Sequence, residues 1–348
     1  MKNLTKIIDL RSDTVTLPSK EMMTSIINSK LGDDVFQEDP TVNKLENRAA
    51  ELVGKESAIL VPSGTMGNLI SILVHAPRGT EVILGDKSHT FIYEAGGISA
   101  FGGIHSHQLK NNTNGTIDLD RIQNAIRDDN VHFPRTSLIS LENTHNMCYG
   151  TPITEKYIKS VKKIADIYSL PIHIDGARIF NSAISQEVDV KQLTGNIDSI
   201  TFCLSKGLAA PIGSVLCGSK TFINEARRIR KALGGGMRQA GIIASAGLFS
   251  LKKFDKQIRF DHNNAQMLAK GINEIDGLRI DIDKVKTNII YFSIDSEIMN
   301  GNELVTLMNS HNIKFFEVSK NRFRLVTHYV INKLDIDYIL SLFNKFIK

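Results

Sequence analysis

The sequence predicts an α/β protein, with a mostly parallel sheet followed by a smaller α/β unit at the C-terminal end. Up to about residue 250, short apolar runs alternate with segments of helical periodicity, which is typical of a parallel sheet covered on both faces. Beyond that point, a long polar helix leads into a second set of strands and helices. We therefore expect an N-terminal arm over residues 1–30, a large domain over residues 31–250 and a small domain over residues 251–348.

The elements of the large domain follow from local signals. Asp39 and Pro40 form a helix start, with Asp as the N-cap and Pro at the first helical position, and Gly54 ends this helix. Thr154 caps a crossover helix expected over residues 155–168. The predicted strands cover residues 58–61, 81–84, 137–141, 172–174, 197–202 and 214–217.

The small domain is predicted to begin with a polar helix near residues 254–272. Helices are also expected near residues 301–310 and 334–347. The candidate strands cover residues 278–282, 288–294 and 323–327. Residues 10–16 are more polar than a core strand and are predicted to form an extended arm.

Composition favours an ordinary enzyme over a nucleic-acid-binding protein. The chain has 42 Lys and Arg against 37 Asp and Glu, and this excess of +5 is spread along the sequence without an arginine-rich stripe. No apolar run approaches the length that spans a bilayer, and no signal peptide is evident, so we expect no membrane partner and a cytoplasmic location.

The three cysteines, Cys148, Cys203 and Cys217, show neither a disulfide framework nor the spacing of metal ligands. This pattern favours a reducing compartment and predicts no metal site.

Two predicted strands end in residues that suit pyridoxal phosphate. Asp175 closes one strand, and Lys206 closes the next strand along the chain. A lysine can form a Schiff base with this cofactor, and an aspartate can keep its pyridine nitrogen protonated, so that the ring accepts electrons. Taken singly, a strand-end Asp is more often a turn residue and a Lys more often a solvated side chain.

A candidate phosphate site follows an earlier strand. Ser63, Gly64 and Thr65 open a helix, where free backbone amides and two hydroxyls can hold a phosphate. The same three residues also form a common turn and N-cap. The interpretation as a phosphate site is therefore supported only in combination with Asp175 and Lys206.

Three further residues fit an amino-acid substrate on such a cofactor. His89, at a strand end, can stack on a flat ring and move protons, although a hydrogen-bonded turn histidine is the alternative. Arg178 and Arg324 can bind a carboxylate with their planar forks. Arg324 stands in an apolar strand, where an arginine is costly unless it points into a site; the alternative is an edge-strand surface residue.

Eight short motifs together are similar to one known family. They are residues 9–16 (DLRSDTVT), 32–35 (GDDV), 63–65 (SGT), 142–146 (ENTHN), 173–178 (HIDGAR), 204–207 (LSKG), 234–239 (GGGMRQ) and 324–328 (RLVTH). Over nearly its full length the chain resembles the low-specificity L-threonine aldolases, within the aspartate-aminotransferase-like (fold type I) pyridoxal-phosphate enzymes. The resemblance implies a large domain with a mostly parallel seven-stranded sheet and a small C-terminal α/β domain.

The resemblance also implies roles for individual residues. Lys206 would carry the cofactor as an internal aldimine, Asp175 would pair with the pyridine nitrogen, and His89 would stack on the ring. The phosphate would be held by Ser63, Gly64 and Thr65 and, across a subunit interface, by Lys231 and Arg238. The substrate would meet Ser12, Arg178 and Arg324 through its carboxylate, and His132, Tyr93 and Phe36 near its side chain. Shared sites of this kind imply a homo-oligomer, usually a tetramer of paired dimers.

The implied reaction is an aldehyde-lyase reaction, the retro-aldol cleavage of L-threonine, L-allo-threonine and related β-hydroxy-α-amino acids to glycine and an aldehyde. The base that takes the hydroxyl proton stays open between His89, His132 and a water held between them. Phe36 departs from the family, because many relatives have a tyrosine there, and this change puts the side-chain preference in doubt. The cofactor residues do not separate this reaction from β-elimination, transamination or racemisation. A non-catalytic cofactor sensor is an alternative from another class, and the presence of Lys206, Arg178 and Arg324 argues against it.

Overall fold

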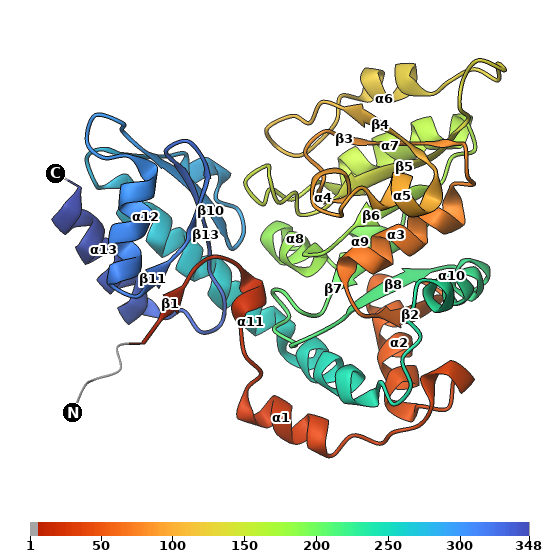
Figure 1. The fold of residues 1–348 in the computed structure, drawn as a ribbon, viewed down its shortest axis with the longest axis horizontal. Helices are drawn as coiled ribbons and strands as arrows, with labels where there is room; N and C mark the ends of the chain where they lie inside the picture. Colours follow the sequence, from red (N-terminus) through yellow and green to blue (C-terminus); the bar gives the residue numbers. More distant parts are fainter. Residues whose placement is uncertain (1–5, 348) are drawn as a thin grey trace.

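The computed structural model describes residues 6–347 and shows two lobes joined by one long helix. This helix, α11 (Gly241–Asn273), contains 33 residues and runs from the large lobe into the small one (Figure 1). The boundary expected at residue 250 falls inside α11, so the division of the chain into domains stays a prediction. Within residues 6–347, no helix is both long and apolar enough to cross a bilayer.

The large lobe is built on a seven-stranded sheet with the order β2-β8-β7-β6-β5-β3-β4. Only β8 runs antiparallel to its neighbours, so the predicted fold class, a mostly parallel α/β sheet, is confirmed. The strands are β2 (Ser57–Val61), β3 (Glu81–Gly85), β4 (His105–Leu109), β5 (Thr136–Glu142), β6 (Ile172–Asp175), β7 (Ser199–Cys203) and β8 (Ser214–Gly218).

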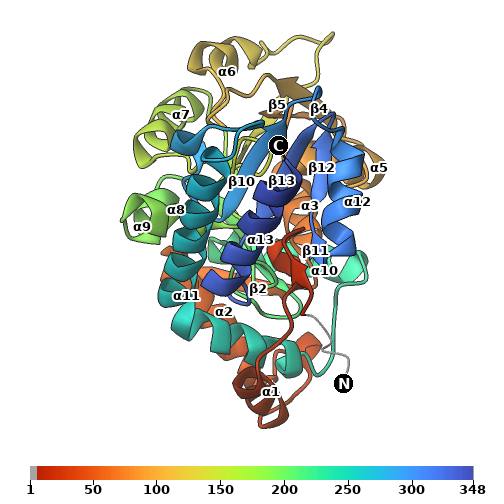
Figure 2. The same cartoon turned by 90° about the vertical axis from the view of Figure 1, so that its left-hand side faces the viewer.

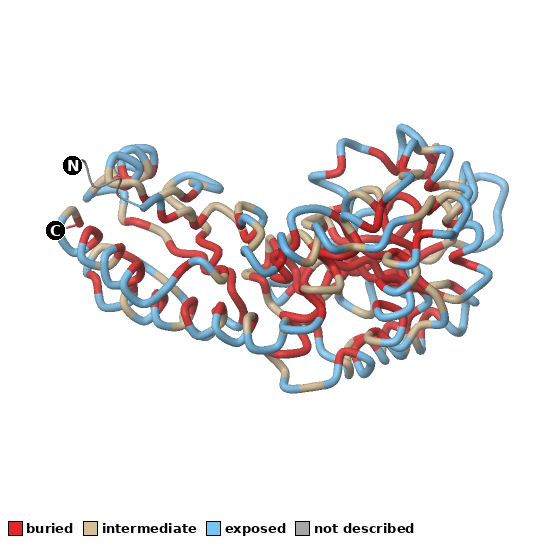
Figure 3. Tube along the Cα trace, turned by 90° about the horizontal axis from the view of Figure 1, so that it is seen from below, coloured by how far each residue is buried: buried red, intermediate tan, exposed pale blue. Residues whose placement is uncertain are grey.

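Helices cover both faces of this sheet, so its strands are apolar on both sides. In β2, Ala58 and Leu60 face one hydrophobic core, whereas Ile59 and Val61 face another. The buried segments in Figure 3 gather accordingly in the middle of the large lobe. The helices of this lobe are α2 (Pro40–Val53), α3 (Gly64–His75), α4 (His89–Ile92), α5 (Gly97–Gly102), α6 (Leu119–Ala125), α7 (Glu155–Ile167), α8 (Ile179–Gln186), α9 (Val190–Thr194) and α10 (Lys220–Ala232).

Helix starts form where capping side chains stand in the sequence. Ser63 accepts a hydrogen bond from the Met66 amide at the start of α3, and Thr154 caps α7 in the same way. The buried Asp39 caps α2 and also accepts a bond of 2.9 Å from the amide of Gly241, the first residue of α11. One carboxylate therefore ties the starts of two helices together.

The small lobe contains a four-stranded antiparallel sheet with the order β12-β13-β10-β9. Residues of α11, α12 and α13 pack against one face of it (Figure 2). The other face carries Tyr291 and Arg324, which are partners in the register. The elements are β9 (Leu278–Ile280), β10 (Ile289–Ile294), α12 (Gly301–Ser310), β11 (Ile313–Lys314), β12 (Phe316–Ser319), β13 (Arg322–Val326) and α13 (Lys333–Phe346), with a short 3-10 helix, η3 (Ile282–Lys284).

The N-terminal segment belongs to both lobes. Its first strand, β1 (Ile8–Asp9), pairs in parallel with β11, and the amide of Leu10 donates to the carbonyl of Lys314 at 2.7 Å. The segment then turns through η1 (Asp13–Val15) to α1 (Lys20–Ile27), which packs on α11 beneath the large lobe (Figure 1). A further 3-10 turn, η2 (Asp34–Phe36), precedes α2.

Candidate active site

The candidate residues gather at the carboxyl edge of the large sheet. Asp175 is the last residue of β6, Lys206 stands three residues after β7 ends, and His89 opens α4 beyond β3. Ser63 lies between the end of β2 and the start of α3. Because β2, β3, β6 and β7 all point the same way, their carboxyl ends bring these side chains to one place.

Two adjoining cavities open there. The first, about 200 Å³ in volume, we call the Ser63 cavity; the second, about 180 Å³, we call the Arg324 cavity. Their walls share four residues, which are His89, Asp175, Ala177 and Lys206. Because the two cavities share these walls, they form one continuous site whose two ends differ in chemistry.

The Ser63 cavity offers hydrogen-bond donors at its far end. Ser63, Gly64 and Thr65 line it at the N-terminus of α3, together with Ser205. A side chain at Gly64 would stand 2.8 Å from the sulfur of Cys203, so glycine is required for the close approach of α3 to the sheet. Hydroxyls and helix-start amides together form a site suited to a phosphate.

Asp175 is held rigidly with its carboxylate in the cavity wall. Its Oδ1 accepts from the Ala177 amide at 3.0 Å, and its Oδ2 accepts from Nδ2 of Asn68 at 3.0 Å. Beneath it, burial lowers the pKa of His173 to about 3, so that ring is neutral. The carboxylate thus has fixed donors and no cation of its own within hydrogen-bond reach among the described residues.

His89 is fixed from both its backbone and its ring. Its amide donates to Oε2 of Glu142 at 2.6 Å, and its Nδ1 lies 2.9 Å from Oε1 of Glu94. Burial works to lower the pKa of His89, but the hydrogen bond to Glu94 and the charge of Asp175 outweigh it, so this pKa is raised.

Arg178 is engaged by a partner that the sequence did not reveal. Its Nε and Nη2 each donate to a carboxylate oxygen of Asp13 at 2.7 Å, and both side chains are buried. Burial works to raise the pKa of Asp13, but the Arg178 guanidinium outweighs it and holds this pKa at about 2. Asp13 therefore occupies the Nε and Nη2 edge of the Arg178 guanidinium, and a substrate carboxylate could bind only to the other side of this group.

Arg324 reaches the same cavity from the small lobe. Its Nη1 donates to Oδ1 of Asn146 and its Nη2 to the carbonyl of Arg11, each at 3.0 Å. Its Nε is buried and has no hydrogen-bond partner within residues 6–347. Ser12 lines the same cavity. The arginine thus points into a site, and the carboxylate-binding end is formed jointly by the N-terminal segment and both lobes.

Comparison with known proteins agrees with this arrangement. Residues 9–295 match the model of the beta-eliminating lyase family. The chain belongs to the beta-eliminating lyase family. It is 44% identical over 342 residues to low-specificity L-threonine aldolase 1 of Arabidopsis thaliana, covering 97% of this chain and 96% of that protein.

Solved structures place this lyase in the expected fold. A threonine aldolase of Leishmania major superposes with a TM-score of 0.82 at 15% identity, over 98% of this chain and all of that one (100%). A serine palmitoyltransferase solved with pyridoxal phosphate superposes with a TM-score of 0.75 at 17% identity, over 97% of this chain and 87% of that one. The fold type, the family resemblance and the classification as a lyase are thereby confirmed.

Several residues that the family resemblance singled out line neither cavity of the lyase. Phe36 is exposed, and the guanidinium of Arg238 lies 5.9 Å from the centre of its ring. Arg238 also pairs with Asp33 at 3.1 Å, and Lys231 lies close by, beside Gly236. The roles expected for Phe36, Lys231 and Arg238 stay predictions.

Two other predicted residues also lie outside the cavity walls. His132 stands in an exposed segment between α6 and β5. Tyr93 is 54% exposed, and its ring lies 5.5 Å from that of His89, centre to centre. Tyr93 is therefore next to the site without lining it, and the functions of both residues stay predictions.

The structure adds residues that sequence reasoning left without a role. They are Asp13, Asn68, Glu94, Glu142 and Asn146, and each bonds directly to a predicted site residue. Three of them, Asp13, Glu142 and Asn146, stand inside the family motifs, which was a usable signal. Asn68 stands one helical turn after Gly64 in α3, so it faces the same cavity.

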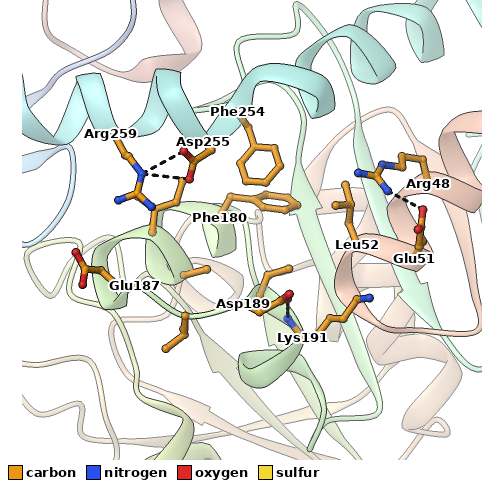
Figure 4. Close-up of a pocket in the computed structure, with 14 residues that line it drawn as sticks. Arg48, Glu51, Leu52, Phe180, Glu187, Asp189, Lys191, Phe254, Asp255 and Arg259 are labelled. Carbon is orange, nitrogen blue, oxygen red and sulfur yellow. Dashed lines mark hydrogen bonds and ion pairs between the residues drawn. The ribbon is translucent and has the colours of Figure 1, made fainter.

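A larger cavity of about 390 Å³ lies elsewhere, between α2, α8, α9 and α11 (Figure 4). Phe180 and Phe254 form its apolar floor, with ring centres 4.7 Å apart. Its arginines are already paired, Arg48 with Glu51 and Arg259 with Asp255. No predicted site residue lines this larger cavity. The size of a cavity therefore does not identify the active site here, whereas the lysine, aspartate, histidine and arginines indicate the Ser63 and Arg324 cavities.

Proposed function

We propose that this lyase cleaves L-threonine, L-allo-threonine and related β-hydroxy-α-amino acids to glycine and an aldehyde, with pyridoxal phosphate as its cofactor. One observation carries the proposal: Lys206 and Asp175 line both cavities, of which one offers phosphate donors and the other two arginines. The names of the curated relatives support the reaction type.

The residues present fit the cofactor. Lys206 supplies the amine, Asp175 an anion for the pyridine nitrogen, and the start of α3 with Ser63 and Thr65 a place for the phosphate. The buried hydroxyl of Ser214 near Gly64 has no partner within residues 6–347, so the region has unused hydrogen-bonding capacity. When bound, pyridoxal phosphate supplies an electron sink for bond breaking at Cα.

The protein's own side chains would orient the substrate. Arg324, with its free Nε, and Ser12 would bind the carboxylate, and Arg178 would add the part of its guanidinium that Asp13 leaves open. By holding the carboxylate, these side chains would determine which bond of Cα is oriented for cleavage. His89 lines both cavities and is the best-placed base; His132 or a bound water stays an alternative.

We also propose that the working form is a homotetramer of paired dimers. The exposed group of Phe36, Lys231 and Arg238 would then complete the site of a neighbouring subunit.

Product analysis tests the reaction directly. Incubation of the cofactor-loaded protein with L-threonine should release glycine and acetaldehyde in equal amounts, the aldehyde being followed with a coupled NADH assay. L-allo-threonine should give the same products. A keto acid and ammonia instead would retain the cofactor and replace the proposed reaction with elimination.

Arg324→Ala should lower kcat/KM for L-threonine by about a hundredfold or more, because a charged hydrogen-bonding partner of the carboxylate is lost from a partly buried position. Since Arg324 also fixes orientation, kcat should fall along with the rise in KM. Steady-state aldehyde release measures both constants. Arg279→Ala, which removes an exposed arginine of β9, is the matched control and should leave both unchanged. Normal turnover in Arg324→Ala would show that Arg324 does not bind the substrate carboxylate.

A further inference from the structure

We propose that Glu94 is a positioning residue, which holds His89 with its hydrogen on Nδ1 and joins it through Asn68 to Asp175. This inference deepens the proposed function and rests on it, because His89 matters as a base only if a proton moves in this site. Glu94 is not itself part of the family motifs on which the sequence analysis relied.

The contacts of Glu94 converge on one oxygen. Its Oε1 lies 2.9 Å from Nδ1 of His89 and accepts from Nδ2 of Asn68, also at 2.9 Å. The side chain is buried and lines the Ser63 cavity. An ionised carboxylate only accepts hydrogen bonds, so Oε1 accepts from the amide and from His89, and the ring hydrogen then stands on Nδ1.

Asn68 is fixed in one orientation by its own neighbours. The two hydrogens of its Nδ2 point to Glu94 and to Asp175, and its Oδ1 lies 3.2 Å from Nε2 of His173. The Nδ1 of His173 in turn faces the hydroxyls of Ser71 and Ser199 at 2.9 and 3.0 Å. Reversing the amide would set its oxygen against two carboxylates, so Asn68 acts as a spacer between them.

This amide also argues against a cation at the same place. Ligand atoms of His89, Glu94 and Asp175 all lie within 4.8 Å of one another, a spacing that a metal ion could use. However, the hydrogens of Asn68 point at both carboxylates and satisfy them, and a cation would have to displace these bonds. The cluster is therefore a hydrogen-bond network around His89.

The charged groups that face His89 come from four elements. Glu94 follows α4, Asp175 ends β6, Lys206 follows β7, and Glu142 ends β5 and accepts from the His89 amide. Burial and Lys206 oppose the protonated ring of His89, whereas Glu94 and Asp175 favour it. For Glu94 itself, burial is the first cause and the nearby charge of Asp175 another, and together they raise its pKa. A proton taken up by Glu94 would sit on its other oxygen, Oε2, and would leave Oε1 as the acceptor.

The arrangement has a consequence for the reaction. With hydrogen on Nδ1, the neutral ring of His89 carries its lone pair on Nε2, which is the state that can accept a substrate proton. Protonated His89 cannot do so. The activity should therefore fall on the acid side as pH drops through the pKa of His89, and Glu94 helps to set that pH.

Glu94→Gln separates the charge from the hydrogen bonds, because the amide oxygen of Gln can still accept from both partners. Loss of the charge should lower the pKa of His89 by about one unit. This pKa can be read from ring NMR signals of ¹³C-histidine in the full-length, cofactor-loaded protein without substrate, with His89→Asn identifying the signal. The acid limb of kcat/KM for L-threonine should shift to lower pH by the same amount. Glu155→Gln, at the partly exposed first residue of α7 and outside both cavities, is the control and should shift neither.

A damaged fold alone would lower activity without moving the acid limb downward. An unchanged His89 pKa in a folded Glu94→Gln protein would overturn the inference. So would ring ¹⁵N shifts of the wild-type protein that place the neutral hydrogen on Nε2, a result that needs no variant. Because the NMR measurements use no substrate, they separate the two proposals. If the His89 pKa shifts as expected but no aldehyde is released, only the proposed reaction is wrong. If aldehyde is released but the His89 pKa is unchanged in Glu94→Gln, only the proposed role of Glu94 is wrong.

Discussion

Lys206→Ala should abolish aldehyde release from L-threonine, with a fall in kcat of roughly a thousandfold or more, because the group that would anchor the cofactor is gone. Among residues 6–347, Lys206 is the only lysine in the walls of the two cavities, so this part of the chain offers no second amine to replace it. The absorbance band of the cofactor–lysine linkage should disappear as well.

The measurement compares spectra and aldehyde release before and after L-threonine is added. Lys252→Ala, which removes an exposed lysine of α11, serves as the control and should retain both the band and the activity. If Lys206→Ala kept its band or its turnover, the assignment of the whole site would be wrong. If the wild-type protein showed no band at all, the cofactor itself would be the error.

Asp13→Ala should lower the free energy of unfolding at neutral pH by about 3–5 kcal/mol, because the buried Arg178 would lose the carboxylate that pairs with it and remain as an unpaired charge. Denaturant unfolding at a fixed protein concentration measures this change. Asp129→Ala breaks an exposed pair with Arg135 and should change the same free energy by no more than about 0.5 kcal/mol.

The difference between wild type and Asp13→Ala should also depend on pH. The pKa of Asp13 is held at about 2, below its usual 3.8, so the folded state favours the charged form. The stabilisation is therefore complete above about pH 4 and is lost as pH falls through about 2. A variant as stable as wild type at neutral pH, or a difference that grew on acidification, would contradict this account of the pair.

The elements that are strongly patterned in sequence were predictable. All six strands expected in the large domain are present, with ends shifted by two residues or fewer. The caps at Asp39 and Thr154 also lie where the sequence places them. These signals are local, and burial on both faces of the sheet leaves an apolar run that is easy to recognise.

Among the elements that the sequence did not predict correctly, two illustrate the physical reasons. Strand β4 (His105–Leu109) is an edge strand with partly exposed polar side chains, so it lacks an apolar run. Helix α11 begins at Gly241, well before the polar segment that predicted it. Its first turns contain small buried residues such as Ala244 and Gly247, which show no clear amphipathic stripe; Gly247 lies against Leu45 of α2 and Leu204.

The site, like the fold, was only partly predictable from the sequence. The ends of the strands indicated that Lys206, Asp175 and His89 would lie together, because the carboxyl ends of parallel strands share one edge of the sheet. The partners of these residues could not be read in this way, since Asn68 bonds to a carboxylate 107 positions away and Asp13 to an arginine 165 positions away. Such pairs depend on how loops are placed after folding, which no local pattern records.

The pairing of β1 with β11 bears on the order in which this protein is made. Residues 8–13 leave the ribosome well before the small lobe is complete, yet Leu10 bonds to Lys314 and the carbonyl of Arg11 to Arg324, 313 positions later. The large sheet can form as its strands are synthesised, because their partners are already present. The carboxylate-binding end cannot, because residues 8–13 must wait until Lys314 and Arg324 have been made. Translation therefore yields a folded core well before it yields a competent catalyst.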